Sequence, residues 1–333
     1  MATINEIAAK LGISKSTVSR VINNDPNVKE KTRESVWRVI RELDYKPNII
    51  ARGMITGSLP LVLVIVGDIQ NHYFAKTIIG IEKVLTEKDY MPVIYNSMYD
   101  VEKEKRLIRM AKDCQFAGII PMTGVRSNEL EECLRDVDCP VVLINRELKK
   151  LDLDEIYGDD VEASYKATQE LIDNGHRVIA HLSGSSTSTV STKRRLGYCM
   201  ALEDNGIPVD EALIFEGKLD MASGYALGEK LFALPGITAV CSNNFLMAMG
   251  VVRYAKSIGK TVLKDFDIAC CETVPDLYEE SAYVYAGADL EEIGKTATEI
   301  LLKRIEKAEE PRQKICFPAT QVYNPKKEIE SRF

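Results

Sequence analysis

The chain has 333 residues, enough for about two domains, and it needs neither disulfides nor a structural metal to build a core of that size. Hydrophobic residues make up 45% of the sequence and charged residues 28%, which excludes a chain that is disordered throughout. The net charge of −7 argues against nucleic-acid binding, but residues 1–57 hold ten Lys or Arg against six Asp or Glu, so they carry +4 and leave −11 for the remainder.

The first elements that the sequence predicts are two short helices joined by a tight turn. Thr3 and Glu6 have the spacing of a capping box, and apolar residues then recur at helical intervals until Gly12, a residue suited to end a helix. Ser14 is placed to cap a second helix that extends to about Ile22. A third helix is expected over roughly 30–43, with an apolar face formed by Val36, Val39, Ile40 and Leu43.

This arrangement is typical of a helix-turn-helix unit, whose second helix can enter the major groove of DNA. The outward face of that helix is polar and basic, and Arg20 can reach the O6 and N7 atoms of guanine. A generic three-helix bundle with a solvated face fits the same periodicity, so the residues alone leave both interpretations open. The candidate DNA contacts in this part of the chain are Thr3, Ser14, Lys15, Ser16, Thr17, Arg20 and Asn23.

The segment from Thr3 to Arg52 resembles the N-terminal signature of the LacI/GalR family of bacterial transcription regulators. The resemblance rests on the run T-I-N-E-I-A-A-K-L-G-I-S-K-S-T-V-S-R-V-I-N and, further on, L-D-Y-K-P-N-x-x-A-R, matched without a gap. It implies a helix-turn-helix DNA-binding domain over residues 1–47. It also implies a homodimer on a pseudo-palindromic operator, because one such unit reads only a half-site.

Residues 48–58 are expected to form a hinge helix and linker. Asn48 can cap a helix of about eight residues, which is too short to be stable alone in water. The resemblance implies that this helix orders on DNA, pairs with its dimer mate and drives an apolar side chain into the minor groove. The family usually has Leu at that position and this chain has Met; a passive linker is the plainer alternative. The candidate DNA contacts here are Asn48, Ala51 and Met54.

From Leu59 onward, strand-like and helix-like segments alternate, which is typical of parallel sheets covered by helices. Strands are expected at 61–66, 92–95, 118–122, 141–144, 178–182, 238–241 and 266–270. Helices are expected at 75–88, 102–113, 163–174, 194–205, 225–234 and 246–258. Two α/β lobes with a cleft between them fit this pattern, since ligands of such sheets sit beyond the carboxyl ends of the strands.

This body resembles the core of the same family in shorter patches, found within residues 66–74, 140–146, 175–184 and 194–207. The fold class that we predict is an all-α helix-turn-helix head plus hinge helix, joined to an α/β two-lobed core like that of periplasmic binding proteins. The effector-binding and dimerisation core would span residues 59–333. Its N-lobe is expected at about 59–159 plus 288–317, and its C-lobe at about 160–287 plus 318–333.

The resemblance implies a transcription regulator, which we expect to be a repressor, controlled by a carbohydrate-type effector between the lobes: a sugar, sugar acid or sugar phosphate. A sugar site needs an aromatic surface and planar donors and acceptors for neighbouring hydroxyls. The candidate effector contacts are Asn71, Phe74, Arg146, Arg194, Phe245 and Glu272.

Several of these positions depart from the family's pattern. Asn145 replaces an Asp, Phe245 stands where an Asp is expected after Asn244, and Glu272 is a candidate to restore the missing carboxylate. Fewer carboxylates in the cleft would leave its two arginines less neutralised. That reasoning favours an anionic effector.

The main alternative is a sugar-processing enzyme, for example a kinase, that carries a DNA-binding head. No GxSxG, GxGxxG, P-loop or HExxH motif occurs, so we expect no enzyme and neither a catalytic residue, a cofactor nor a metal. His176 and His181 are interpreted as structural, and acidic pairs such as Glu131–Glu132 as solvated. A solute-binding transport component is a second alternative, against which the basic head counts.

The sequence also bounds the compartment. The chain does not open on a secretory signal, and no apolar stretch approaches the roughly 18 residues of a membrane span. None of the eight cysteines belongs to a CxxC pair, and the neighbours Cys270 and Cys271 make a poor disulfide. We therefore expect a cytoplasmic protein with reduced, mostly buried cysteines and no membrane partner.

Overall fold

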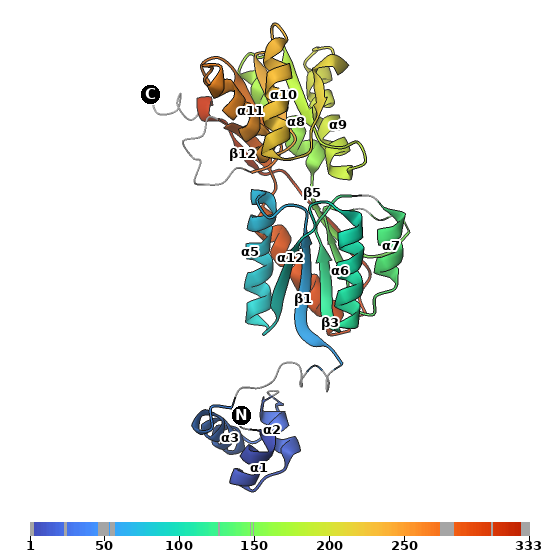
Figure 1. The fold of residues 1–333 in the computed structure, drawn as a ribbon, viewed down its shortest axis with the longest axis vertical. Coiled ribbons are helices and arrows are strands. Elements are labelled where there is room, and N and C mark those ends of the chain that lie inside the picture. Colours follow the sequence, from blue (N-terminus) through green and yellow to red (C-terminus); the bar gives the residue numbers. More distant parts are fainter. Residues whose placement is uncertain are drawn as a thin grey trace. The chain divides into compact units, whose positions relative to one another are not determined.

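The computed structural model describes residues 3–22, 25–45, 53, 57–125, 127–146, 148, 150–273, 283–307 and 309–327 (Figure 1). The chain separates into two compact units, Met1–Leu59 and Pro60–Phe333. Four of the predicted DNA contacts lie outside the described residues, as does nearly all of the predicted hinge helix. These four are Asn23, Asn48, Ala51 and Met54.

In the described part of the first unit, three helices pack around a small apolar core: α1 (Ile4–Leu11), α2 (Lys15–Ile22) and α3 (Glu30–Glu42). The predicted capping box is confirmed, since the Thr3 side chain accepts a hydrogen bond from the Glu6 amide and the Glu6 carboxylate accepts one from the Thr3 amide. Gly12 ends α1 at φ 64°, in the left-handed region that favours glycine. These local signals fix the turn that presents α2.

The described residues of the second unit form two sheets, and the first belongs to what we call the N-lobe. Its strands are β1 (Leu59–Val66), β2 (Met91–Asn96), β3 (Phe116–Pro121), β4 (Val142–Ile144), β5 (Asp154–Gly158) and β11 (Lys314–Phe317). The orders β2-β1-β3 and β4-β5-β11 are joined by a parallel bridge between Ile119 and Val141. The helices of this lobe are α5 (His72–Glu87), α6 (Val101–Asp113), α7 (Asn128–Arg135) and α12 (Leu290–Ile305).

Side chains that alternate along β1 contact helices on opposite faces of the sheet. Val62, Val64 and Val66 pack with residues of α5 and α12, whereas Leu63 and Ile65 pack with residues of α6 and α7. A strand that is apolar at every position is the pattern expected for a sheet covered on both faces.

Helices α5 and α12 approach each other closely. A Cβ atom at Gly80 would lie 2.1 Å from the Glu291 carbonyl oxygen, and one at Gly294 would lie 2.1 Å from the Thr77 carbonyl oxygen. Only glycine fits where the two backbones come this near.

The second sheet, that of the C-lobe, has the order β12-β10-β9-β8-β6-β7. Its strands are β6 (Ile179–Ser183), β7 (Ile214–Glu216), β8 (Ala239–Ser242), β9 (Asp267–Cys270), β10 (Tyr283–Gly287) and the antiparallel β12 (Gln321–Tyr323). The helices α10 (Met221–Ala233) and α11 (Phe245–Ser257) cover one face, and α8 (Asp160–Asp173) and α9 (Thr189–Asp204) cover the other (Figure 1).

Where the structure describes it, the chain passes between the two sheets three times. It does so from β5 to α8, from β10 to α12 and from β11 to β12. Each passage is short: Gly158 is followed by α8 at Asp160, and Phe317 by β12 at Gln321.

Five strands go beyond the seven that the sequence predicts: β5, β7, β10, β11 and β12. Three of them have only three or four residues and are half-exposed, so no apolar run marks them. The expectation of mostly buried cysteines is wrong, because three of the eight, Cys241, Cys270 and Cys271, are buried, while three are half-buried and Cys114 and Cys316 are exposed. All eight are free.

The interpretation of Glu131 as a solvated residue is also wrong. Its side chain is buried on α7, where a carboxylate oxygen accepts a hydrogen bond from the Lys150 amide at 3.2 Å. In the described part of the chain, no helix combines the length and apolar character needed to cross a membrane.

Candidate functional site

The first candidate site is the exposed face of α2. Ser14 caps this helix, because its hydroxyl oxygen accepts a hydrogen bond from the Thr17 amide at 3.1 Å. The same oxygen lies 2.7 Å from the Ser16 hydroxyl and 2.8 Å from the Thr17 hydroxyl, so three hydroxyls gather at the helix N-terminus. Hydroxyls and free amides at a helix N-terminus form a suitable anion site, such as one for a DNA phosphate.

Burial divides α2 as the sequence predicts. Val18 and Val21 are buried, whereas Lys15, Ser16 and Arg20 are exposed. The Arg20 side chain is 66% exposed, and its guanidinium lies 3.8 Å from the Asp25 carboxylate, which leaves it able to reach a base edge. Thr3 is exposed too, but its hydroxyl is engaged in capping α1.

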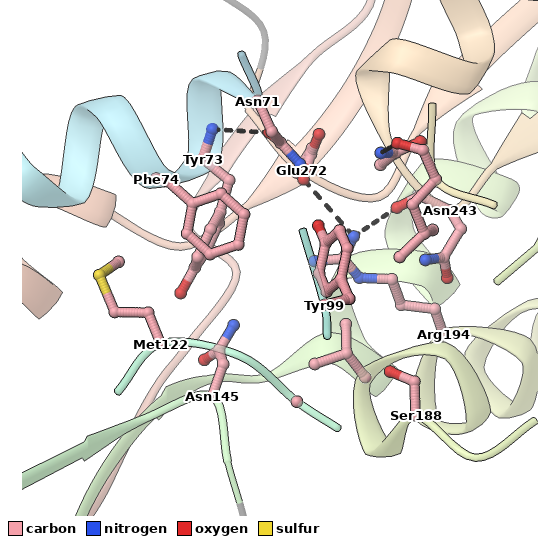
Figure 2. A pocket seen from close by; sticks show the side chains of 14 residues that line it. Asn71, Tyr73, Phe74, Tyr99, Met122, Asn145, Ser188, Arg194, Asn243 and Glu272 are labelled. Carbon is pink, nitrogen blue, oxygen red and sulfur yellow. Dashed lines mark hydrogen bonds and ion pairs between the residues drawn. The ribbon is translucent and has the colours of Figure 1, made fainter. Parts of the chain in front are cut away.

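The second candidate site is a cavity between the two lobes of the core (Figure 2). It has a volume of about 60 Å³, and residues that follow the carboxyl ends of strands in both sheets line it. The N-lobe contributes Asn71, Tyr73, Phe74, Tyr99, Met122, Gly124 and Asn145. The C-lobe contributes Ser188, Val190, Arg194, Leu219, Asn243, Asn244 and Glu272.

Three helices begin at this cavity, and the side chain that caps each of them lines it. Asn71 caps α5 and accepts from the Tyr73 amide, Ser188 caps α9, and Asn244 caps α11 and accepts from the Met247 amide. The positive ends of three helix dipoles therefore converge on the cavity, which favours an oxygen-rich ligand.

Arg194 lies at the centre of the polar wall. Its Nε atom donates to the Asp160 carboxylate at 2.8 Å, its Nη1 atom donates to the Asn243 carbonyl, and Nη1 lies 3.6 Å from the Glu272 carboxylate. Burial raises the pKa of the Asp160 and Glu272 carboxyls, although the Arg194 guanidinium opposes the shift. Glu272 is also held by the Phe245 amide, which donates to it at 2.8 Å.

Two polar atoms of the cavity wall are buried without a partner in the described part of the chain. These are the Tyr73 hydroxyl, from the N-lobe, and the Asn243 side-chain oxygen, from the C-lobe. Burial raises the pKa of the Tyr73 hydroxyl, so it stays protonated and remains a donor. A ligand or ordered water that accepts from one and donates to the other would satisfy both.

Four of the six predicted effector contacts line the cavity: Asn71, Phe74, Arg194 and Glu272. The structure places Phe245 elsewhere, with its ring in the C-lobe core and 5.3 Å from the ring of Tyr283. Its backbone amide, rather than its ring, contributes to the site by donating a hydrogen bond to Glu272.

Arg146 is not among the cavity residues either. Its Nη2 atom lies 2.6 Å from the Glu104 carboxylate, and its Nε atom donates to the Thr123 carbonyl. The Arg146 and Glu104 side chains are 1% and 0% exposed. The expectation that the two arginines are poorly neutralised is therefore wrong, because Arg146 has Glu104 while Arg194 has Asp160 and Glu272.

Sequence reasoning missed most of the cavity's amide and aromatic residues, among them Tyr73, Tyr99, Asn243 and, as contacts, Asn145 and Asn244. Four of them follow a strand end within three residues, and Tyr73 follows the end of β1 by seven, so the carboxyl ends of the predicted strands were the available signal. The chemistry that they provide is hydrogen bonding and aromatic contact around one paired arginine.

Two family descriptions match the chain. "Bacterial regulatory proteins, lacI family" matches residues 3–48, and "Periplasmic binding proteins and sugar binding domain of LacI family" matches residues 60–328. Catabolite control protein A of Priestia megaterium is 35% identical over 268 residues, which are 80% of this chain and 81% of that protein. The HTH-type transcriptional repressor PurR of Vibrio parahaemolyticus is 31% identical over 312 residues, 93% of each chain.

Solved structures agree with these matches. The complex of the transcriptional regulator CelR with cellobiose is similar over 97% of this chain and 98% of that one, with a TM-score of 0.72 and 25% identity. Lac repressor bound to ONPG is similar over 96% and 98%, with a TM-score of 0.80. At 22% identity the latter similarity concerns the fold, a helical head and a two-sheet α/β core, and it confirms the predicted fold class.

Proposed function

Because the chain belongs to the LacI family of bacterial transcription regulators, a non-enzymatic family, we propose that it represses transcription by binding a pseudo-palindromic operator as a homodimer under the control of a carbohydrate effector. Family membership sets aside the alternative of a sugar-processing enzyme. The effector would bind between the lobes and change the affinity for DNA by favouring one lobe arrangement over another.

The inter-lobe cavity carries the effector part of the proposal. Its amides, hydroxyls and aromatic rings suit a sugar, whose hydroxyls both donate and accept while its ring faces are apolar. Arg194 already faces Asp160 and Glu272, so its guanidinium is paired within the protein and offers no free charge to an anionic ligand. We therefore favour a neutral sugar over a sugar acid or sugar phosphate.

The DNA part of the proposal is supported by the exposed face of α2 and by the charge of +4 on residues 1–57. Ser14, Lys15, Ser16, Thr17 and Arg20 would contact the major groove and its phosphates. The roles of Thr3 and Asn23 near this helix, and of Asn48, Ala51 and Met54 in a hinge helix, remain part of the same proposal. A cytoplasmic location goes with it, since the operator is bacterial DNA.

We place the lobe boundaries at about 59–159 plus 288–317 and 160–287 plus 318–333. This division is supported by β5 and β11 lying in one sheet and β10 and β12 in the other.

A second copy of the chain has a candidate surface on the N-lobe. In the described sheet β2 is an edge strand, and large apolar side chains are exposed on it and on the neighbouring α5: Ile79, Met91, Ile94 and Tyr95. Apolar residues on an open sheet edge are a liability unless something covers them. Ile94→Lys is expected to convert a dimer to a monomer in analytical ultracentrifugation.

The experiment that tests the function is selection of duplexes from a random DNA library by the full-length protein. We expect two-fold symmetric sites, and we expect Arg20→Ala to change the selected bases within each half-site. Lys31→Ala, which removes the same charge from an exposed position on α3, serves as the control and should weaken binding without changing the bases. Recovery of no preferred sequence by the wild type would contradict the proposal.

A further inference from the structure

The loop between β2 and α6 has an unusual backbone. Met98 and Tyr99 have φ values of 56° and 58°, in the left-handed region that side chains other than glycine and asparagine seldom adopt. Among the described residues they are the only neighbouring pair of non-glycine residues with positive φ. Strain of this kind persists only where the surrounding structure imposes it, and it gathers at ligand-binding sites.

The conformation places the Tyr99 ring in the wall of the inter-lobe cavity (Figure 2). The ring lies over Gly67, just after the end of β1, where a Cβ atom would be 2.2 Å from a ring carbon. It also lies near Phe74, with 6.4 Å between the ring centroids. Tyr99 therefore occupies space that the missing side chain of Gly67 leaves open.

The C-lobe repeats this arrangement. Leu219 follows β7 with a φ of 63°, lines the same cavity, and lies over Gly184, where a Cβ atom would be 2.8 Å from a Leu219 methyl carbon. β7 pairs with β6 at the edge of its sheet as β2 pairs with β1. Corresponding loops of the two lobes thus each place one large residue with a left-handed backbone conformation in the cavity wall.

We propose that Tyr99, together with Leu219 from the other lobe, determines effector specificity by restricting the cavity to a single sugar ring. The inference rests on the proposed carbohydrate effector and adds the size class of that effector. Tyr99 lines the cavity from the N-lobe and Leu219 lines it from the C-lobe, so the two side chains together limit the space that a ligand can occupy. Removal of the Tyr99 ring would enlarge it from the N-lobe side and would also relieve the backbone strain.

The test compares sugar binding by full-length wild type, Tyr99→Gly and a control. Gln115→Gly is the matched control, because Gln115 has a φ of 55° but is exposed and does not line the cavity. Thermal shifts are titrated with the monosaccharides D-glucose, D-galactose and D-ribose and with the disaccharides cellobiose, lactose and maltose. Gly67→Ala serves as a second cavity variant, since its methyl group would displace the Tyr99 ring without removing it.

We expect wild type and Gln115→Gly to respond to at least one monosaccharide and at least tenfold more weakly to the disaccharides. In Tyr99→Gly the ratio of disaccharide to monosaccharide Kd should fall at least tenfold, and Gly67→Ala should also change it. Unchanged ratios in both cavity variants, or a wild type that binds a disaccharide as well as a monosaccharide, would overturn the size restriction alone. No response from any of the four proteins would overturn the carbohydrate effector and the size restriction together.

Discussion

The buried ion pair between Glu104 and Arg146 provides a quantitative test of the N-lobe. Glu104 Oε2 lies 2.6 Å from Arg146 Nη2, and the Glu104 Oε1 atom accepts from the hydroxyls of Thr123 at 2.6 Å and Ser97 at 3.3 Å. Neutralising one member leaves the other charge buried without compensation. Glu104→Gln and Arg146→Met are each expected to lower the free energy of unfolding by about 3–5 kcal/mol.

The double variant should be far less unstable than the sum of the two single variants. It buries no charge, so its cost is that of the weakened hydroxyl hydrogen bonds, about 1–3 kcal/mol. The coupling free energy from the double-mutant cycle should therefore exceed about 3 kcal/mol.

The assay is guanidinium unfolding followed by two probes. Far-UV circular dichroism follows the core, while the fluorescence of Trp37, the single tryptophan of the chain, reports on α3 of the head and serves as an internal control. The midpoint of the Trp37 transition should not move. Single variants that each cost less than about 1 kcal/mol, or effects that simply add, would refute the reasoning. Arg146 would then return to the candidate effector contacts.

Three further predictions concern stability. Burial raises the pKa of Asp267, but hydrogen bonds from neighbouring side chains outweigh burial and lower the pKa to about 2. About 2 kcal/mol of stability should therefore be present above pH 4 and be lost as the pH falls toward 2. Asp267→Asn should remove this pH dependence, measured by acid denaturation. Burial lowers the pKa of His181 to about 4, so the unfolded state takes up a proton first and stability should fall between about pH 6.5 and 4. His181→Phe should abolish this fall without lowering stability at pH 8, because the His181 ring is fully buried and stacks on Tyr198. A lower melting temperature of the variant at pH 8 would contradict that interpretation. Gly80→Ala should lower the free energy of unfolding in urea by about 1–3 kcal/mol, because the added methyl group meets the backbone at Glu291 rather than a side chain that can move. An unchanged unfolding midpoint would mean that α5 and α12 are not packed as described.

The head could be predicted from the sequence because its signals are local. Thr3, Glu6, Gly12 and Ser14 each act on residues no more than four positions away, so spacing alone identifies the two helices and their turn. Periodicity then assigns Val18 and Val21 to the core and Arg20 to the exposed face.

The cavity was predictable only in part, because long-range packing decides which side chains face it. Arg146 does not line it but is paired with Glu104, a buried carboxylate on a helix whose charged sequence resembles a solvated surface. Tyr99 enters the cavity because Gly67, thirty-two positions earlier, leaves room for it. The partners in each pair are more than thirty positions apart, so no local pattern reveals them. The strands β7, β11 and β12 were missed for another reason, because they are short and half-exposed and so have no apolar pattern.

The three passages between the sheets limit how the lobes can move. β5 and β11 are neighbours in one sheet, and β10 and β12 are neighbours in the other, so the short connections that leave them run close together. We expect these three short, adjacent connections to resist sliding of the lobes and to favour rotation of one lobe against the other about the line on which the connections lie. If one rotation dominates, the size of a ligand in the cavity that Tyr99 and Leu219 line would set the opening angle between the lobes. The opening angle would then depend on the size of the bound effector before any change reaches the DNA-binding unit.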